Sequence, residues 1–132
     1  MNPPVQQRHF TRYEFVESPI LIEIPDLSLV MLEPGNLSWG GYETPERAVD
    51  QLGVKLSLPD PIRSPQAGMS VMCDLEVMSH PFPGCAAEIP WAAGGKGEAP
   101  WTLGLRISIP EGLLSRFRGA MRDSFHLLRP EE

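Results

Sequence analysis

Prolines and glycines interrupt this chain along its whole length, with 15 prolines and 12 glycines among 132 residues. Proline removes a backbone hydrogen-bond donor, and both residue types end or bend regular structure. A largely helical protein is therefore disfavoured, and the segments between the interruptions favour short strands joined by turns. The chain is long enough to bury one hydrophobic core, so we expect a single domain over residues 1–132.

Apolar and polar residues alternate in several of these segments, which is typical of a strand with one buried face. The alternation is clearest at residues 54–58, between Gly53 and Pro59. Further strands are predicted over residues 15–24, 27–32, 69–78 and 103–109, and a strand that includes residues 36–41 brings the number to six. The segment 79–100 is rich in proline and glycine, and residues 94–97 within it are predicted to form a hairpin tip.

The two ends of the chain differ from this central region. Residues 1–14 show little apolar periodicity, and we expect them to form an extended, flexible arm before a β domain at 15–109. Residues 110–128 carry apolar side chains at spacings of three and four, which predicts one amphipathic helix. Arg118 and Arg122 are predicted to lie on its solvated face. The expected fold class is mainly β with one C-terminal helix.

The charge and hydropathy of the chain limit its partners. The formal net charge is −6, whereas DNA, RNA and anionic membranes favour a basic surface. We expect no nucleic-acid binding, and an anionic ligand must be held by a local cluster of arginines. The most apolar region, residues 19–32, is interrupted by Glu23, Pro25 and Asp26, so we expect no membrane insertion. The N-terminus lacks the pattern of a signal peptide, which favours a cytoplasmic protein.

Cysteine and histidine residues offer an enzyme as an alternative. Cys85 and His80 could act as a nucleophile and its base if they met in space. We expect instead that Cys73 and Cys85 are reduced, structural thiols, because a cytoplasmic compartment disfavours disulfides. His9, His80 and His126 are scattered without the spacing of metal ligands, so no metal site is predicted. We expect neither catalytic residues nor a cofactor.

Two arginines lie four residues apart in the N-terminal arm, in the sequence Arg8-His9-Phe10-Thr11-Arg12. The planar guanidinium group suits anionic and purine ligands, because it can grip a phosphate, pair with the O6 and N7 edge of guanine, or stack on a base. A pair of arginines at this spacing also arises often by chance. A second copy, in the predicted C-terminal helix, is better explained by a solvated helix face.

A rarer pattern follows in the sequence NLSWGG, which begins at Asn36. In a strand, Asn36 and Ser38 point to one face while Trp39 points to the other. The polar pair can then contact a ligand outside while Trp39 fills the core inside. Gly40 and Gly41 allow a ligand to approach the backbone closely, or allow the strand to bulge. The alternative interpretation is a turn beside a buried tryptophan.

The two patterns, in this order, resemble the signature of the PilZ domain family, which is R-x-x-x-R followed by D/N-x-S-x-x-G. Residues 53–59 and 103–107 are similar to later strands of that family, and the predicted C-terminal helix follows where the family has one. The resemblance covers nearly the whole chain. It implies a six-stranded antiparallel β-barrel with a flexible N-terminal arm and one C-terminal helix.

The resemblance also implies a function, as a non-catalytic receptor for the bacterial second messenger cyclic di-GMP that couples ligand binding to an effector protein. The arginines of the first pattern would hold guanine edges and phosphates, and the polar pair of the second would hydrogen-bond a guanine. The final glycine would allow close approach. The implied ligand-binding residues are Arg8, Arg12, Asn36, Ser38 and Gly41, with Gln7, His9 and Gly40 beside them.

An alternative within the same family is an adaptor that binds no nucleotide and acts by protein contact, for example in pilus or motility machinery. Gln6 and Gln7 favour this alternative, because relatives often carry further basic residues before the first arginine. The segment 60–97 departs from the family pattern and is a candidate for the contact with a partner protein. Within and after it, Phe82, Trp91 and Trp101 are compatible with either an exposed patch or core packing.

Overall fold

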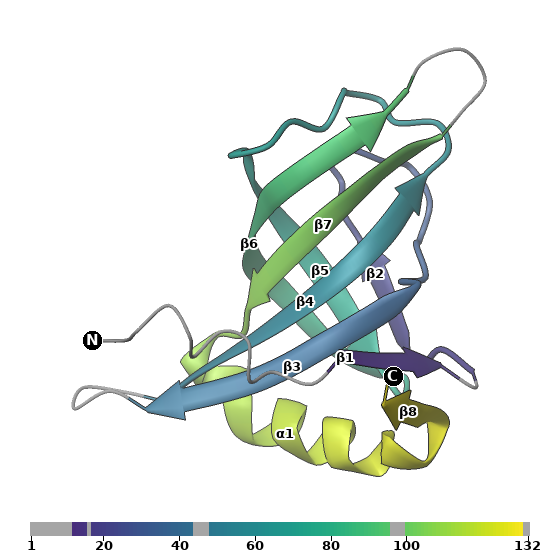
Figure 1. The fold of residues 1–132 in the computed structure, drawn as a ribbon. Helices are drawn as coiled ribbons and strands as arrows, with labels where there is room; N and C mark the ends of the chain where they lie inside the picture. The colour runs from purple at the N-terminus through teal and green to yellow at the C-terminus, as the bar shows by residue number, and fades with distance from the viewer. Residues whose placement is uncertain (1–11, 16, 44–47, 96–99, 131–132) are drawn as a thin grey trace, which may run out of the picture.

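The structure is a computed structural model of the chain, and it describes residues 12–15, 17–43, 48–95 and 100–130. Within these residues, eight strands form one antiparallel sheet that curls into a half-barrel, with a helix across its lower end (Figure 1). The strands are β1 (Arg12–Phe15), β2 (Ile20–Glu23), β3 (Asn36–Glu43), β4 (Ala48–Leu58), β5 (Ser70–Val77), β6 (His80–Gly94), β7 (Trp101–Ser108) and β8 (Leu128–Pro130). The helix is α1 (Leu114–Asp123), and the 3-10 helices η2 (Glu111–Leu113) and η3 (Phe125–Leu127) flank it. The strand order in the sheet is β2-β5-β6-β7-β4-β3-β1-β8.

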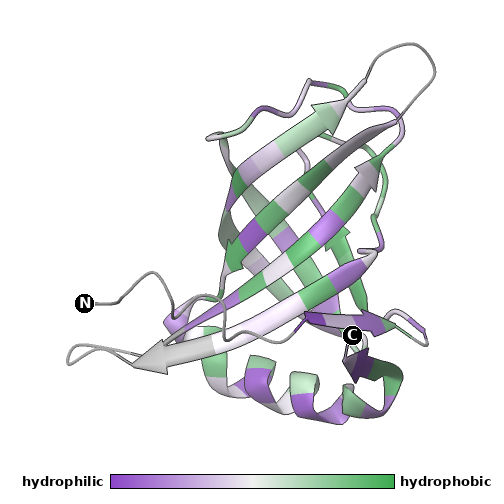
Figure 2. Cartoon of the chain, viewed as in Figure 1, coloured by the Kyte–Doolittle hydropathy of each residue, from purple (hydrophilic) through white to green (hydrophobic). Residues whose placement is uncertain are grey.

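The core lies inside the half-barrel, because apolar side chains alternate along the strands and point to one face. Hydrophobic and hydrophilic residues alternate along the strands in Figure 2. The helix α1 adds one apolar stripe, formed by Leu114, Phe117, Ala120 and Met121. The ring of Phe117 meets that of Phe82 on β6 edge to face, with 5.6 Å between the ring centroids. Sheet and helix therefore share one hydrophobic cluster.

The predicted mainly β, antiparallel fold with one C-terminal helix is confirmed, but the predicted number of six strands is wrong. In the segment 15–24, Phe15 ends β1 and residues 20–23 form β2, and between them the Ser18 hydroxyl accepts a hydrogen bond from the Ile20 N–H at 3.3 Å. These strands lie far apart in the order of the sheet, since β2 is one edge and β1 adjoins the edge strand β8. Residues 12–14, which were assigned to the N-terminal arm, belong to β1.

Residues 27–32 were predicted to form a strand and instead form a turn. The backbone N–H groups of Leu27 and Ser28 both donate to the carbonyl of Ile24, at 2.9 and 3.0 Å. The Ser28 hydroxyl then accepts a hydrogen bond from the Val30 N–H at 3.2 Å. Local bonds of this kind compete with strand pairing. Only one isolated bridge, between Ile22 and Leu32, connects this segment to a strand.

The proline-rich segment after residue 79 was predicted to lie between strands, yet it forms β6, a strand of 15 residues. Proline is tolerated in a strand where its side of the ladder is unpaired. Pro81 and Pro83 precede Ala86, where pairing with β7 begins, and Pro90 falls at a bulge beyond the last paired residue of β5. The expected hairpin is present in part, since Gly94 pairs with Trp101, while residues 96 and 97 lie outside the described residues.

The C-terminal helix is shorter than the predicted range 110–128. The α-helix ends at Asp123, and the buried Ser124 hydroxyl donates to the carbonyl of Met121 at 2.7 Å. After η3 the chain becomes extended, and Leu128 pairs with Phe15 as part of β8. Pro130 was predicted to stop the helix, but it lies in this strand opposite Tyr13.

Candidate ligand-binding site

Polar and basic side chains form a row across the outer face of the half-barrel. Leu37 is buried, so strand alternation places its neighbours Asn36 and Ser38 on the outer face. The strand register places Arg12 of β1 opposite Ser38 of β3, Ser38 opposite Gly53 of β4, and Gly53 opposite Arg106 of β7. Side chains that are directly opposite in a sheet lie close enough to interact. Residues from four strands therefore meet in one line.

A second row runs beside the first. Asn36 is opposite Lys55 of β4, Lys55 is opposite Gly104 of β7, and Gly104 is opposite Trp91 of β6. Each row contains one glycine, Gly53 on β4 and Gly104 on β7, so at these two positions the strand itself adds no side chain to the outer face. The result is a hollow on the convex surface of the sheet, over β3, β4 and β7.

This hollow is a cavity of about 700 Å³. Its lining residues are Arg12, Asn36, Ser38, Gln51, Gly53, Val54, Lys55, Pro90, Trp91, Gly104 and Arg106. A Cβ atom at Gly53 would lie 2.7 Å from the Ser38 hydroxyl oxygen, closer than real Cβ contacts. Glycine at this position therefore lets Ser38 lie over β4 and face the cavity.

Trp91 forms the aromatic wall of the cavity. The register between β6 and β7 shifts between Glu88 and Trp91, and at this bulge both Pro90 and Trp91 are exposed. The indole lies against Gly104, where a Cβ atom would come within 2.9 Å of the ring carbon Cε2. The Trp91 side chain remains 42% exposed. An indole with this exposure can stack on a nucleic-acid base.

The cavity is basic although the chain is acidic. Its lining contains Arg12, Lys55 and Arg106, and none of its lining residues in the described part of the chain is a carboxylate. Lys55 and Arg12 are exposed and make no ion pair with a described residue, while Arg106 lies 4.0 Å from a carboxylate oxygen of Glu88. Against a net charge of −6, this concentration of positive charge favours an anionic ligand.

The structure brings three of the predicted site residues together, namely Arg12, Asn36 and Ser38. Gly40 lies further along β3 opposite Gln51, which lines the cavity. Gly41 pairs with Asp50, whose side chain is buried on the inner face. The remaining candidates, Gln7, Arg8 and His9, lie outside the described residues.

Four lining residues with polar, charged or aromatic side chains were missed by the sequence analysis: Gln51, Lys55, Trp91 and Arg106. The alternation at residues 54–58 already placed Lys55 on the outer face, because Val54 and Leu56 are its apolar neighbours. The alternation at residues 103–109 placed Arg106 on the outer face in the same way, but its place in the cavity depends on the register of β7. Trp91 carried no such signal, because its place in the cavity depends on a bulge. Phe82, in contrast, is fully buried, and Trp101 is partly buried against the core.

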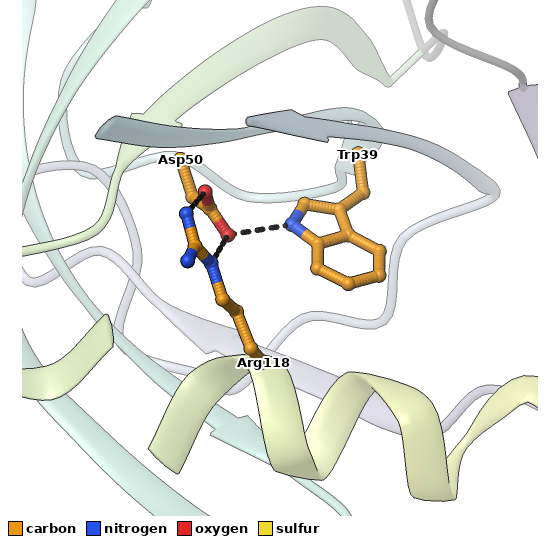
Figure 3. Close-up of polar contacts among 3 residues, drawn as sticks. All are labelled: Trp39, Asp50 and Arg118. Carbon is orange, nitrogen blue, oxygen red and sulfur yellow. Dashed lines mark hydrogen bonds and ion pairs between the residues drawn. The ribbon is translucent and has the colours of Figure 1, made fainter. Parts of the chain in front are cut away.

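A buried ion pair lies on the inner face of the sheet, behind β3 and β4, which carry part of the cavity on their outer face. Arg118 of α1 donates two hydrogen bonds to the carboxylate of Asp50, at 3.1 and 2.7 Å, and the indole N–H of Trp39 donates a third at 3.0 Å (Figure 3). The prediction of a solvated Arg118 is therefore wrong, because this side chain reaches back to β4. Trp39 is half-buried and packs against Phe117 on the inner side, as its strand position predicted.

The two cysteines also lie in the interior, where Cys73 pairs across strands with Cys85. Both are free thiols. Burial, together with neighbouring Asp74, raises the pKa of Cys85 to about 11, and its thiol donates to the carbonyl of Phe82 at 3.4 Å. His80 is exposed at the start of β6. A thiol held protonated in the core is a poor nucleophile, so the geometry gives no support to a Cys85–His80 pair.

Among the described residues, no cluster of three or more histidine, cysteine, aspartate or glutamate side chains is placed to hold a metal ion. In the same part of the chain, no helix is both long and apolar enough to cross a membrane. Comparison of the chain with models of known protein families, with curated proteins and with solved structures gives no match.

Proposed function

We propose that this protein is a non-catalytic receptor for cyclic di-GMP, of the PilZ type, that couples ligand binding to an effector protein in the bacterial cytoplasm. The observation that carries the proposal is that Arg12, Asn36 and Ser38, which come from two separate sequence patterns, line one basic cavity. The sequence patterns suggested the ligand, and the cavity supplies an independent reason to expect an anion at these residues.

The chemistry of the cavity suits this ligand. Cyclic di-GMP carries two phosphates and two guanines, so it needs cations, polar groups for base edges, and surfaces for stacking. Arg12, Lys55 and Arg106 offer the cations, Asn36 and Ser38 offer hydrogen bonds, and Trp91 offers an aromatic surface. The volume of about 700 Å³ lies within the range of small-molecule sites, which is roughly 300–1,000 Å³.

The position of the cavity supports coupling to the rest of the protein. Ser38 and Gln51 line the cavity, and their chain neighbours Trp39 and Asp50 hold α1 through Arg118. A ligand that orders β3 and β4 on the outer face therefore acts on the strands that carry the helix contact. We propose that this contact passes the signal to the effector.

A calorimetric titration with cyclic di-GMP tests the proposal, with GTP as the control ligand. We expect saturable binding to the wild-type chain and a loss of affinity of about tenfold to hundredfold in Arg12→Ala, because one charge-assisted contact is removed. Arg63→Ala is the matched control, since Arg63 is exposed and does not line the cavity. The control should bind like the wild type.

Two results would contradict the proposal. No heat and no competition at high cyclic di-GMP concentration would favour the adaptor that binds no nucleotide. Equal affinity in wild type and Arg12→Ala would show that the ligand binds elsewhere on the protein.

A further inference from the structure

Arg106 lies between the ligand cavity and a second hollow of the outer face. This second groove has a volume of about 400 Å³ and crosses β5, β6 and β7. Its lining includes Met72, Ala86, Glu88 and Ser108. Arg106 lines both hollows. Its side chain is therefore placed to contact a molecule in the cavity or a group in the groove.

The present partner of Arg106 is a weak one. The guanidinium nitrogen Nη1 lies 4.0 Å from a carboxylate oxygen of Glu88, and the two side chains are 49% and 64% exposed. This distance is too long for a hydrogen bond. Ion pairs between exposed side chains contribute little, because water screens both charges. Arg106 can thus leave Glu88 at small cost.

A ligand anion in the cavity offers Arg106 a better partner. Gly53 is directly opposite Arg106 in the sheet, and beyond Gly53 lies Ser38. Because Gly53 has no side chain, nothing at this position stands between the guanidinium and a ligand that contacts Ser38. A phosphate or a guanine edge there could accept two hydrogen bonds from the guanidinium, which is stronger than a contact with a distant carboxylate.

We propose that Arg106 is a ligand-binding residue that exchanges Glu88 for the bound ligand. The inference rests on the proposed function and adds a residue outside both signature patterns. On binding, Glu88 loses its cation and the adjacent groove becomes more acidic. Occupancy of the cavity thereby changes the charge of a second surface without any backbone movement.

A double-mutant cycle tests the exchange, with cyclic di-GMP as the titrated ligand. Arg106→Gln should lower the affinity about tenfold, because a charged contact is lost. Glu88→Gln should raise the affinity about two- to fivefold, because Arg106 no longer has to leave a partner. In the Arg106→Gln background, Glu88→Gln should have no effect. Both side chains are exposed, so thermal unfolding should show that all variants fold like the wild type.

The controls separate this inference from the function on which it rests. If the wild type does not bind, the receptor proposal and the exchange both fail. If the wild type binds and Arg12→Ala weakens binding, but Arg106→Gln titrates like the wild type, only the exchange fails. An equal gain from Glu88→Gln with and without Arg106 would also overturn it, because the carboxylate would then act on the ligand directly.

Discussion

Two glycines shape the outer face of the sheet. Gly53 and Gly104 lie in the middle of the two rows of side chains, and each is overlain by a neighbour that needs the space. Ser38 lies against the first and the Trp91 indole against the second. Glycine is normally unfavourable in a strand interior. Its presence there often marks a position where another group approaches the backbone closely. Here the approach creates both the floor and the aromatic wall of the cavity.

Gly104→Ala should displace Trp91 from the cavity wall. The added methyl group would overlap the indole, and a small shift of the large ring would not remove the overlap. The chain has three tryptophans, so a heteronuclear NMR spectrum should show three indole N–H signals. We expect the Trp91 signal to shift in the variant and that of Trp39, which is held by Asp50, to stay in place.

A matched variant controls for the added methyl group itself. Gly112→Ala meets no atom within 4 Å, so all three indole signals should remain unchanged. Ligand affinity should fall in Gly104→Ala alone. A Trp91 signal that does not move in Gly104→Ala would contradict the packing of the indole on β7.

The helix α1 is attached to the sheet by both apolar and ionic contacts. Its buried stripe covers the lower end of the half-barrel, and Phe117 packs against Phe82 of β6 and Trp39 of β3. Arg118 adds a contact across 68 residues of sequence to Asp50, whose side chain is only 1% exposed. Three donated hydrogen bonds compensate the burial of that carboxylate. The orientation of the helix is thus specified by a polar contact as well as by packing.

Removing Arg118 should destabilise the protein strongly. In Arg118→Met, Asp50 would remain buried without its cation, and breaking a buried pair in this way costs about 3 kcal/mol or more. Arg122→Met is the control on the same helix, because Arg122 is exposed, and it should change the free energy of unfolding by less than about 0.5 kcal/mol. Urea unfolding measures both. Equal stability of the two variants would mean that Asp50 is compensated by other groups.

The molecule as a whole separates an apolar interior from an outer face that carries the chemistry. Buried groups inside include the thiols of Cys73 and Cys85, and exposed cations outside include Arg12 and Lys55. The half-barrel encloses one hydrophobic cluster, and burial in it raises the pKa of both thiols. The stability of the fold should therefore decrease at alkaline pH.

The free energy of unfolding should fall as the pH rises above about 9. Burial raises the pKa of Cys73 to about 12 and that of Cys85 to about 11, from 9.0. The unfolded chain loses these protons first, so the stabilising contribution is complete below pH 9 and is lost towards the folded pKa values. Each thiol contributes up to about 1.4 kcal/mol per pH unit in this interval.

Urea unfolding at pH 8, 9 and 10 measures this dependence. The double variant Cys73→Ala/Cys85→Ala should be less stable at pH 8, because small cavities replace the sulfur atoms. Its stability should nevertheless decline less steeply between pH 9 and 10. The same slope in both proteins would show that other groups govern alkaline unfolding.

Local patterns in the sequence predicted much of this molecule. Alternation at residues 54–58 predicted part of β4, and the spacing of apolar residues around Phe117 predicted the buried face of α1. Strand alternation also placed Ser38 outside and Trp39 inside. These predictions succeeded because the side-chain periods of strand and helix are properties of the local backbone.

The wrong predictions have two different causes. Residues 27–32 are apolar enough for a strand, but local hydrogen bonds to the carbonyl of Ile24 and to the hydroxyl of Ser28 hold them in a turn. The prolines of β6 are compatible with a strand because β7 leaves their positions unpaired, although Pro81 is opposite Glu76 of β5. This pairing depends on the register of distant strands and cannot be predicted from a window of sequence.

The candidate site also contains residues that sequence patterns predicted and residues that only the tertiary structure places. Sequence patterns were sufficient to single out Arg12, Asn36 and Ser38, which line one cavity. Only the register of the sheet places Arg106 across Gly53 from Ser38, and only the curl of the sheet brings Asp50 under Arg118. The physical reason is that residue type and local periodicity are encoded position by position, whereas strand register is a property of the whole sheet. It minimises the free energy of all the strands together, and the cavity is a consequence of that register.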